Sequence, residues 1–123
     1  AAIMNGHAYK VAMSETHHIH KVDSPSGTAI SLADQILEQN ESLNTWIEGE
    51  STKEDELPIA AIRSGEVPGT HEIRYISSID TISIKHEAHN REGFANGAVI
   101  AAQWIVGKIG VFSMNDVISV KKS

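Results

Sequence analysis

The sequence predicts an α+β fold in which a small mixed β-sheet carries helices on one face. Three observations support this fold class. The predicted order of elements is strand, helix, several strands and helix. The first predicted helix has an apolar stripe and the second is rich in alanine. The length of 123 residues suffices for one domain with a hydrophobic core. Two helices cover only one face of such a sheet, so we expect another copy of the chain to cover the other face.

The N-terminal part of the chain predicts a strand, a loop and a helix. The strand spans Ala8–Thr16, where apolar residues alternate with smaller or polar ones. The stretch His17–Thr28 is polar, contains glycine and proline, and is predicted to be a loop. Ser24-Pro25 is typical of a helix start, a capping residue followed by the residue favoured at the first helical position. The apolar positions that recur at helical spacing after it are Ala29, Leu32, Ala33, Ile36 and Leu37.

The rest of the chain predicts three strands and a second helix. Asn40–Leu57 is polar and acidic, and we expect an excursion with at most a short helical turn. The predicted strands are Ile59–Arg63, Thr70–Ser77 and Thr81–Ala88. The loop between the last two is short enough for a hairpin. The second helix is predicted over Asn96–Val106.

The composition excludes several classes of protein. The chain has no cysteine, which rules out disulfide scaffolds, thiolate zinc sites and cysteine nucleophiles. Its net charge of −6 argues against nucleic acid or an anionic membrane as the main partner. No apolar run approaches the roughly 18 residues that span a bilayer, and no signal peptide is visible, so a cytoplasmic location is expected. The first residue is Ala1 rather than Met, which suggests a piece of a longer protein.

The stretch Glu15–Thr28 contains the candidate functional residues. It contains three histidines and a lysine within five positions and then a small-residue loop that leads into a helix. The free backbone N–H groups near Gly27 and Thr28, together with the positive end of the helix dipole, form an anion site. Gly27 has no Cβ and permits close approach of a ligand. The sequence therefore predicts a pocket for a small carboxylate or phosphate beside a titratable acid.

The histidine and lysine side chains of this stretch suit proton transfer and anion binding. The pKa of histidine lies near 6.5, whereas lysine stays charged at neutral pH. On a straight strand His17 and Lys21 would lie about 13 Å apart, so they serve one reacting centre only if the chain bends between them. Two other interpretations stay open. The histidines are surface residues without a role, or His18 and His20 are metal ligands.

The run Glu15–Thr28, read as E-x-H-H-x-H-K-x-D-x-P-S-G-T, resembles the signature of the dihydrodipicolinate reductase (4-hydroxy-tetrahydrodipicolinate reductase) family. The resemblance continues through 63–71, which is similar to the family segment R-x-G-x-x-x-G-x-H. It also includes His86-Glu87-Ala88-His89-Asn90-Arg91 and Phe94-Ala95-Asn96-Gly97-Ala98. It covers nearly the whole chain, with 40–57 as the unremarkable part.

The resemblance implies an NADH- or NADPH-dependent reduction of a cyclic imine dicarboxylate in the diaminopimelate route to lysine. It implies that His17 is the general acid–base and that Lys21 is the second catalytic donor. It further implies that His18, Gly27 and Thr28 contact the carboxylates of the substrate. A homotetramer is also expected from the resemblance. No residue of this chain is expected to bind the cofactor or a metal.

The sequence departs from the family in one large respect. The whole enzyme begins with a Rossmann domain that has a Gly-rich phosphate loop, and no such fingerprint occurs here. Residues 1–123 are therefore predicted to be the C-terminal substrate-binding and oligomerisation domain. Residues from about 94 to 123 are expected to pack on the nucleotide domain. The alternatives are a stand-alone oligomerisation module with a vestigial anion pocket and a His-rich metal-binding domain.

Overall fold

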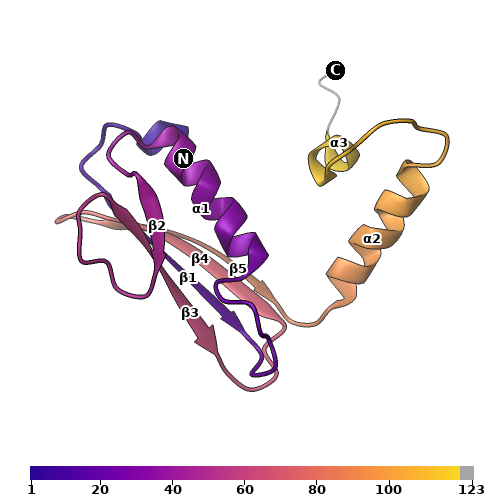
Figure 1. The fold of residues 1–123 in the computed structure, drawn as a ribbon, viewed down its shortest axis with the longest axis horizontal. Coiled ribbons are helices and arrows are strands. Elements are labelled where there is room, and N and C mark those ends of the chain that lie inside the picture. Colours follow the sequence, from indigo (N-terminus) through magenta and orange to yellow (C-terminus); the bar gives the residue numbers. More distant parts are fainter. Residues whose placement is uncertain (120–123) are drawn as a thin grey trace. The chain divides into compact units, whose positions relative to one another are not determined.

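A computed structural model describes residues 1–119 and divides the chain into two compact units, Ala1–His89 and Asn90–Ser123 (Figure 1). Residues 120–123, the end of the segment expected to pack on a nucleotide domain, lie outside the described residues. The α+β class predicted from the sequence is confirmed: within residues 1–119, five strands form one mixed sheet and three segments are α-helical.

The first unit is a five-stranded sheet with strand order β2-β3-β1-β4-β5. The central strand β1 pairs in parallel with β3 and antiparallel with β4. The edge strand β2 is parallel to β3, and β5 closes an antiparallel hairpin with β4. The strand bounds are β1 Lys10–His17, β2 Thr45–Glu48, β3 Glu56–Arg63, β4 Gly69–Ile76 and β5 Thr81–Ala88.

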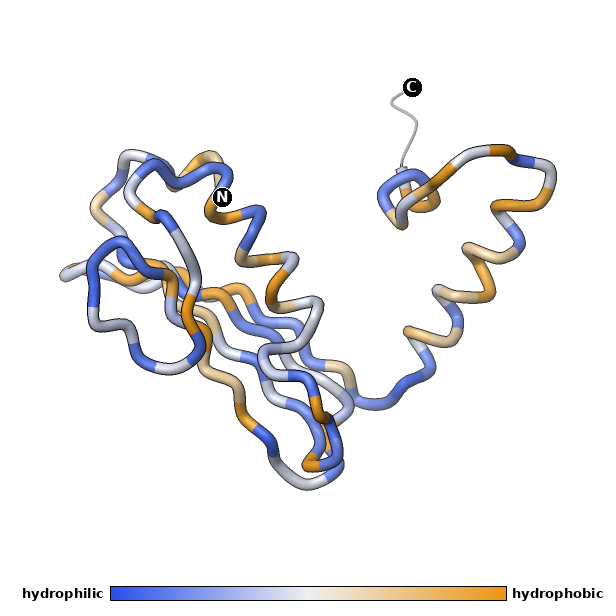
Figure 2. Tube along the Cα trace, in the orientation of Figure 1, coloured by the Kyte–Doolittle hydropathy of each residue, from blue (hydrophilic) through white to orange (hydrophobic). Residues whose placement is uncertain are grey.

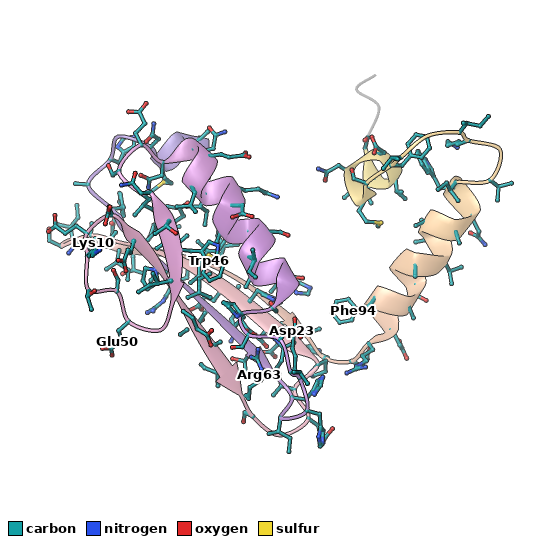
Figure 3. The ribbon with its side chains drawn as sticks, in the orientation of Figure 1. Lys10, Asp23, Trp46, Glu50, Arg63 and Phe94 are labelled. Atoms are coloured by element: carbon teal, nitrogen blue, oxygen red, sulfur yellow. The ribbon has the colours of Figure 1, made fainter. Side chains whose placement is uncertain are left out.

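Helix α1 (Gly27–Gln39) lies on one face of this sheet and encloses the hydrophobic core (Figure 1). Alternate residues of a strand face opposite sides of the sheet, so β1 turns Val11 and Met13 toward the helix. The labelled Trp46 of β2 packs against the same core (Figure 3). The buried apolar residues of the core are Val11, Met13, Ala29, Ala33, Ile36, Leu57, Ile59 and Tyr75.

The opposite face of the sheet is mostly polar or small, as the strand register shows. Ser14 of β1 lies opposite Glu72 of β4, which in turn lies opposite Lys85 of β5. The exposed Ile82 and Ile84 of β5 lie on the α1 side instead, because they pair with Tyr75 and Ile73. Oligomerisation through the sheet stays a prediction, and the apolar surface that favours it lies mainly at β5.

The structure corrects two expectations about the segments around α1. The helix begins at Gly27 with Ser26 as its cap, not at Ser24-Pro25, because the Ser26 hydroxyl accepts a hydrogen bond from the Ala29 amide at 3.1 Å. The Ser24 hydroxyl is engaged elsewhere, since it donates to Glu48 at 2.5 Å. The segment 40–57, expected to be an excursion with at most a helical turn, contains strand β2, which is held by pairing with β3.

The second unit contains α2 (Glu92–Trp104) and the short α3 (Met114–Ile118). Helix α2 begins four residues before the predicted Asn96, because the Asn90 side chain accepts from the Glu92 amide at 2.9 Å. Apolar residues recur along α2 (Figure 2), yet no residue of either helix is buried. The Trp104 and Phe112 rings meet edge to face with centroids 5.1 Å apart. Within residues 1–119, no helix has the length and hydropathy to cross a membrane.

Candidate functional site

The candidate site lies where the ends of β1 and β3 meet the start of β4 and the N-terminus of α1. His17, the last residue of β1, pairs with Arg63, the last residue of β3. The neighbouring Thr16 pairs with Thr70 near the start of β4. Figure 3 labels Arg63 beside Asp23 of the loop that leads into α1. The mixed pairing of β1 therefore brings four segments of the chain to one end of the sheet.

A buried carboxylate lies at the centre of this site. Glu15 follows Val11 and Met13 on the core face of β1 and is 1% exposed. Its oxygens accept hydrogen bonds from both terminal nitrogens of Arg63, at 2.9 and 3.0 Å. They also accept from His17 Nδ1 and, at 3.2 Å, from the Ser26 amide. Burial raises the pKa of this carboxyl, but Arg63 and His17 together outweigh burial and lower it, so Glu15 is ionised.

The imidazole of His17 is held on several sides and is 9% exposed. Nδ1 contacts Glu15, and the ring meets that of His71 edge to face with centroids 5.2 Å apart. Gly69 lies against the other nitrogen: a Cβ at position 69 would be 3.0 Å from His17 Nε2. Glycine at this position therefore allows the close approach of the ring, which any larger residue would push aside by a few tenths of an ångström.

His71 of β4 connects the imidazole of His17 to the helix cap. Its Nε2 lies 3.0 Å from the hydroxyl of Ser26, which already accepts a hydrogen bond from the Ala29 amide. Burial, followed by the charge of His17, lowers the pKa of His71. A neutral His71 accepts the Ser26 proton at Nε2, so the tautomer assigned to His71 carries its hydrogen on Nδ1.

The chain turns after His17, which meets the condition under which His17 and Lys21 serve one centre. The turn is closed by hydrogen bonds from the Ile19 amide to the Gly65 carbonyl at 3.1 Å and from the Lys21 amide to the His18 carbonyl at 3.2 Å. Lys21 Nζ lies 2.9 Å from Asp23 Oδ1, and this hydrogen bond lowers the pKa of Asp23. The charge of Lys21 also contributes to the lowered pKa of His71, as that of His17 does.

The three predicted carboxylate contacts differ in their surroundings. Gly27 and Thr28 form the exposed first turn of α1, and the space in front of the Gly27 α-carbon is open. Ser26 accepts hydrogen bonds from the amides of Ala29 and Ile30, which follow these two residues in the helix. His18 is half-buried after the end of β1, with its ring 6.1 Å from that of His20.

The metal interpretation gains no support from the side chains. Across residues 1–119, no group of three or more histidines and acidic residues could hold a metal ion.

Sequence reasoning missed the contact between Glu15 and Arg63, although both residues lie in the quoted motifs. A signal for Glu15 was present, because it continues the alternation of Val11 and Met13 and therefore falls on the core face. A buried carboxylate requires a charged partner. His71, the last residue of the segment 63–71 quoted above, also reaches the site, because its ring packs against that of His17.

The fold and the candidate site together define a class of protein: an α+β domain with a buried imidazole and an exposed helix N-terminus at one end of a mixed sheet. The family model for the C-terminus of dihydrodipicolinate reductase matches residues 1–118. The chain belongs to this family.

The relatives and a solved structure point the same way. A protein of Christiangramia forsetii named 4-hydroxy-tetrahydrodipicolinate reductase is 53% identical over 97% of this chain and 50% of its own length. A protein of the same name from Rickettsia bellii is 43% identical over 88% of this chain and 44% of its own length. The chain thus spans about half the length of these curated relatives.

A solved structure, described as dipicolinate-bound dihydrodipicolinate reductase from Paenisporosarcina sp. TG-14, matches with a TM-score of 0.59 and 27% identity. The match covers 91% of this chain and 41% of that one. Neither the metal-binding nor the stand-alone alternative gains support from these comparisons.

Proposed function

We propose that residues 1–123 are the substrate-binding and oligomerisation domain of a 4-hydroxy-tetrahydrodipicolinate reductase. The whole enzyme reduces a cyclic imine dicarboxylate in the diaminopimelate route to lysine. The observation that carries this proposal is the position of His17, at the end of β1 and within one site with the exposed first turn of α1. The relatives that share the motif are named for this reductase, and the solved structure is described as binding dipicolinate. A biosynthetic role of this kind keeps the expectation of a cytoplasmic location.

Each site residue has a role in this proposal. His17 is the general acid–base, and since its Nδ1 is engaged by Glu15, Nε2 is the atom that exchanges the proton. Lys21 is the second catalytic donor and binds the anionic substrate. The amides of Gly27 and Thr28 bind a carboxylate of the substrate at the positive end of α1. His18 contributes a further carboxylate contact from the turn after β1.

The reduction adds a hydride and a proton across one double bond of the ring, and His17 donates the proton. NADH or NADPH, bound to a separate nucleotide domain, supplies the hydride. We assign no residue of this chain to the dinucleotide. The residues of this chain bind the dicarboxylate, orient it and hold the proton beside it.

The same proposal includes a nucleotide domain and further copies of the chain as partners. Residues from about 94 to 123 pack on the nucleotide domain, which agrees with the exposed apolar side chains of α2 and of the segment after it. The homotetramer is supported by the exposed Ile82 and Ile84 of β5. Sedimentation of the 123-residue chain at micromolar concentration tests the oligomer, and a monomer contradicts it.

Calorimetric titration with dipicolinate tests the proposed site. The wild-type chain is expected to bind, and Lys21→Ala is expected to weaken binding at least about ten-fold, the loss of one charged contact. Lys85→Ala is the matched control, because it removes the same charge from an exposed position on the opposite face of the sheet. No binding to the wild type, or equal binding to wild type and Lys21→Ala, would overturn the proposal.

A further inference from the structure

The buried carboxylate of Glu15 accepts more hydrogen bonds than an ion pair between two strands would provide. It accepts hydrogen bonds from four donors: His17 Nδ1, the Ser26 amide and both terminal nitrogens of Arg63. A charge that is 1% exposed persists only where paired and hydrogen-bonded groups surround it. Two of these donors belong to the proposed site, since His17 is the acid–base and Ser26 precedes the amides of Gly27 and Thr28.

Arg63 extends the same network to the third element of the site. Its guanidinium binds Glu15 through both terminal nitrogens, and the side chain is 19% exposed. The nitrogen Nη2 also donates to the Asp23 carbonyl at 2.7 Å. The carboxylate of Asp23 in turn binds Lys21 Nζ at 2.9 Å. Arg63 therefore fixes the loop residue that orients the lysine.

We infer that Glu15 and Arg63 are the positioning residues of this site, which hold the imidazole, the ammonium group and the helix amides in one arrangement. This inference rests on the proposed function, because it concerns the same site. Glu15 acts on His17 directly and on Gly27 and Thr28 through Ser26. Arg63 acts on Lys21 through Asp23. Neither residue is assigned a contact with the substrate.

The arrangement has a definite consequence for the proton of His17. An ionised carboxylate only accepts hydrogen bonds, so the Nδ1 of His17 must carry a hydrogen. The lone pair of the neutral imidazole is then on Nε2, the nitrogen that lies beside Gly69. The ion pair thus selects which nitrogen of His17 exchanges the proton.

The substitution Glu15→Gln tests the inference at this atom. The amide offers one oxygen where the carboxylate offers two, so it loses the hydrogen bonds that one of the two oxygens accepts. With its oxygen at the position of Oε1 the amide keeps the hydrogen bonds from the Ser26 amide and Arg63 Nη2. Its nitrogen then lies at the position of Oε2, where it donates to Nδ1 and moves the hydrogen of His17 to Nε2. The control is Glu72→Gln, which removes the same charge on β4 from a surface ion pair on the opposite face of the sheet.

The tautomer is measured by ¹⁵N NMR of the histidine side chains in the 123-residue chain at pH 8, with His17→Asn identifying the signal. The wild type and Glu72→Gln are expected to have His17 protonated at Nδ1, and Glu15→Gln to shift its hydrogen to Nε2. Dipicolinate affinity is expected to fall about ten-fold in Glu15→Gln, the loss of one charge-assisted contact, and to stay unchanged in Glu72→Gln.

Arg63→Lys is the second variant, which keeps the positive charge but loses the fork that reaches Glu15 and Asp23 together. It is expected to keep the Nδ1 hydrogen of His17 and to weaken dipicolinate binding about ten-fold through the displaced Lys21. If Glu15→Gln does not fold, the wild-type tautomer and Arg63→Lys carry the test.

Three results overturn the inference: a wild-type His17 protonated at Nε2, a folded Glu15→Gln with the wild-type tautomer and affinity, or an unchanged affinity in Arg63→Lys. The proposed function fails separately, when the wild-type chain binds no dipicolinate. In that case the NMR spectra still decide whether Glu15 selects the tautomer of His17.

Discussion

The two units of the chain differ in where their apolar side chains lie. In unit 1 the apolar faces of α1 and the sheet meet, and residues such as Leu57 and Ile59 are 0% exposed. In the described part of unit 2, residues 90–119, no residue is buried, although Phe94 and Ile100 of α2 are large and apolar. Unit 1 has the core that an independent fold requires, whereas α2 has an apolar surface without a core of its own. The candidate site lies wholly in unit 1.

The two tryptophans of the chain allow the comparison to be measured. Trp46 lies in unit 1 and Trp104 in unit 2. The substitution Trp104→Phe leaves a fluorescent reporter of unit 1 alone, and Trp46→Phe leaves a reporter of unit 2. Urea unfolding followed with each reporter assigns every effect below to one unit.

Loss of the ion pair is expected to have the largest effect on unit 1. Arg63→Ala leaves the carboxylate of Glu15 buried without its charged partner, which lowers the free energy of unfolding by about 3–5 kcal/mol. Urea unfolding reported by Trp46 measures the loss. Arg74→Ala is the matched control: it breaks an exposed pair with Glu72 and is expected to cost at most about 1 kcal/mol. Equal losses in the two variants would contradict the buried pair.

The same truncation, isoleucine to alanine, compares the core of unit 1 with helix α2 directly. Ile59→Ala removes a fully buried side chain and is expected to lower the free energy of unfolding reported by Trp46 by about 2–5 kcal/mol. Ile100→Ala makes the same change at a position that is 54% exposed, and the expected change is within about 0.5 kcal/mol. A large loss in Ile100→Ala would show that α2 is packed in solution.

The helix caps offer a smaller test in both units. Ser26→Ala removes the cap of α1 and the hydroxyl that contacts His71, so Trp46 should report a loss of about 0.5–2 kcal/mol. Ser113→Ala makes the same change before α3, where the exposed Asp116 still accepts from the backbone amide of residue 113. Trp46 should report no change for it. Equal changes in the Trp46-reported free energy of unfolding for Ser26→Ala and Ser113→Ala would contradict the assignment of the two caps to different units.

Acid is expected to act on unit 1 gradually. The pKa of Glu15 is lower in the folded chain than its reference value of 4.5, so its stabilisation is complete above that pH and is lost as the pH falls through the folded pKa. The pKa of His71 is also lowered, from 6.5, so the unfolded chain binds this proton more tightly and stability falls below pH 6.5. The urea midpoint reported by Trp46 should therefore decrease from pH 7 to pH 4.

His71→Gln separates the two contributions to this pH dependence. The variant is expected to lose the decrease that begins as the pH falls below 6.5 and to keep the decrease at the lower pH where Glu15 titrates. An unchanged profile would mean that His71 does not titrate differently in the folded and unfolded chain.

Much of the fold could be predicted because local patterns suffice for it. The alternation over 81–88 gave the bounds of β5, and the apolar stripe of α1 gave the helix. Strand β2 could not be predicted, because four residues in a polar context have no recognisable period and the strand depends on pairing with β3. The predicted start of α2 at Asn96 was wrong, because the helix begins at Glu92, whose amide donates to the side chain of Asn90.

In the candidate site, too, some residues could be predicted from local sequence and others could not. His17, Lys21 and Gly27 are close in sequence, so their clustering and the helix that follows pointed to them. Glu15 and Arg63 are 48 residues apart, and their contact depends on the parallel pairing of β1 with β3. No local pattern predicts that pairing. Within the site, long-range contacts are therefore the part that sequence reasoning could not supply.

Gly69 shows how the sheet constrains the site without contributing a functional group. A methyl group there would approach the imidazole nitrogen of His17 to 3.0 Å, so the ring would have to move. Gly69→Ala would thus shift this imidazole by a few tenths of an ångström while every charge in the molecule stays in place. Substitutions of increasing size at position 69 therefore offer a way to vary the placement of this ring in steps, with no change in the charges around it.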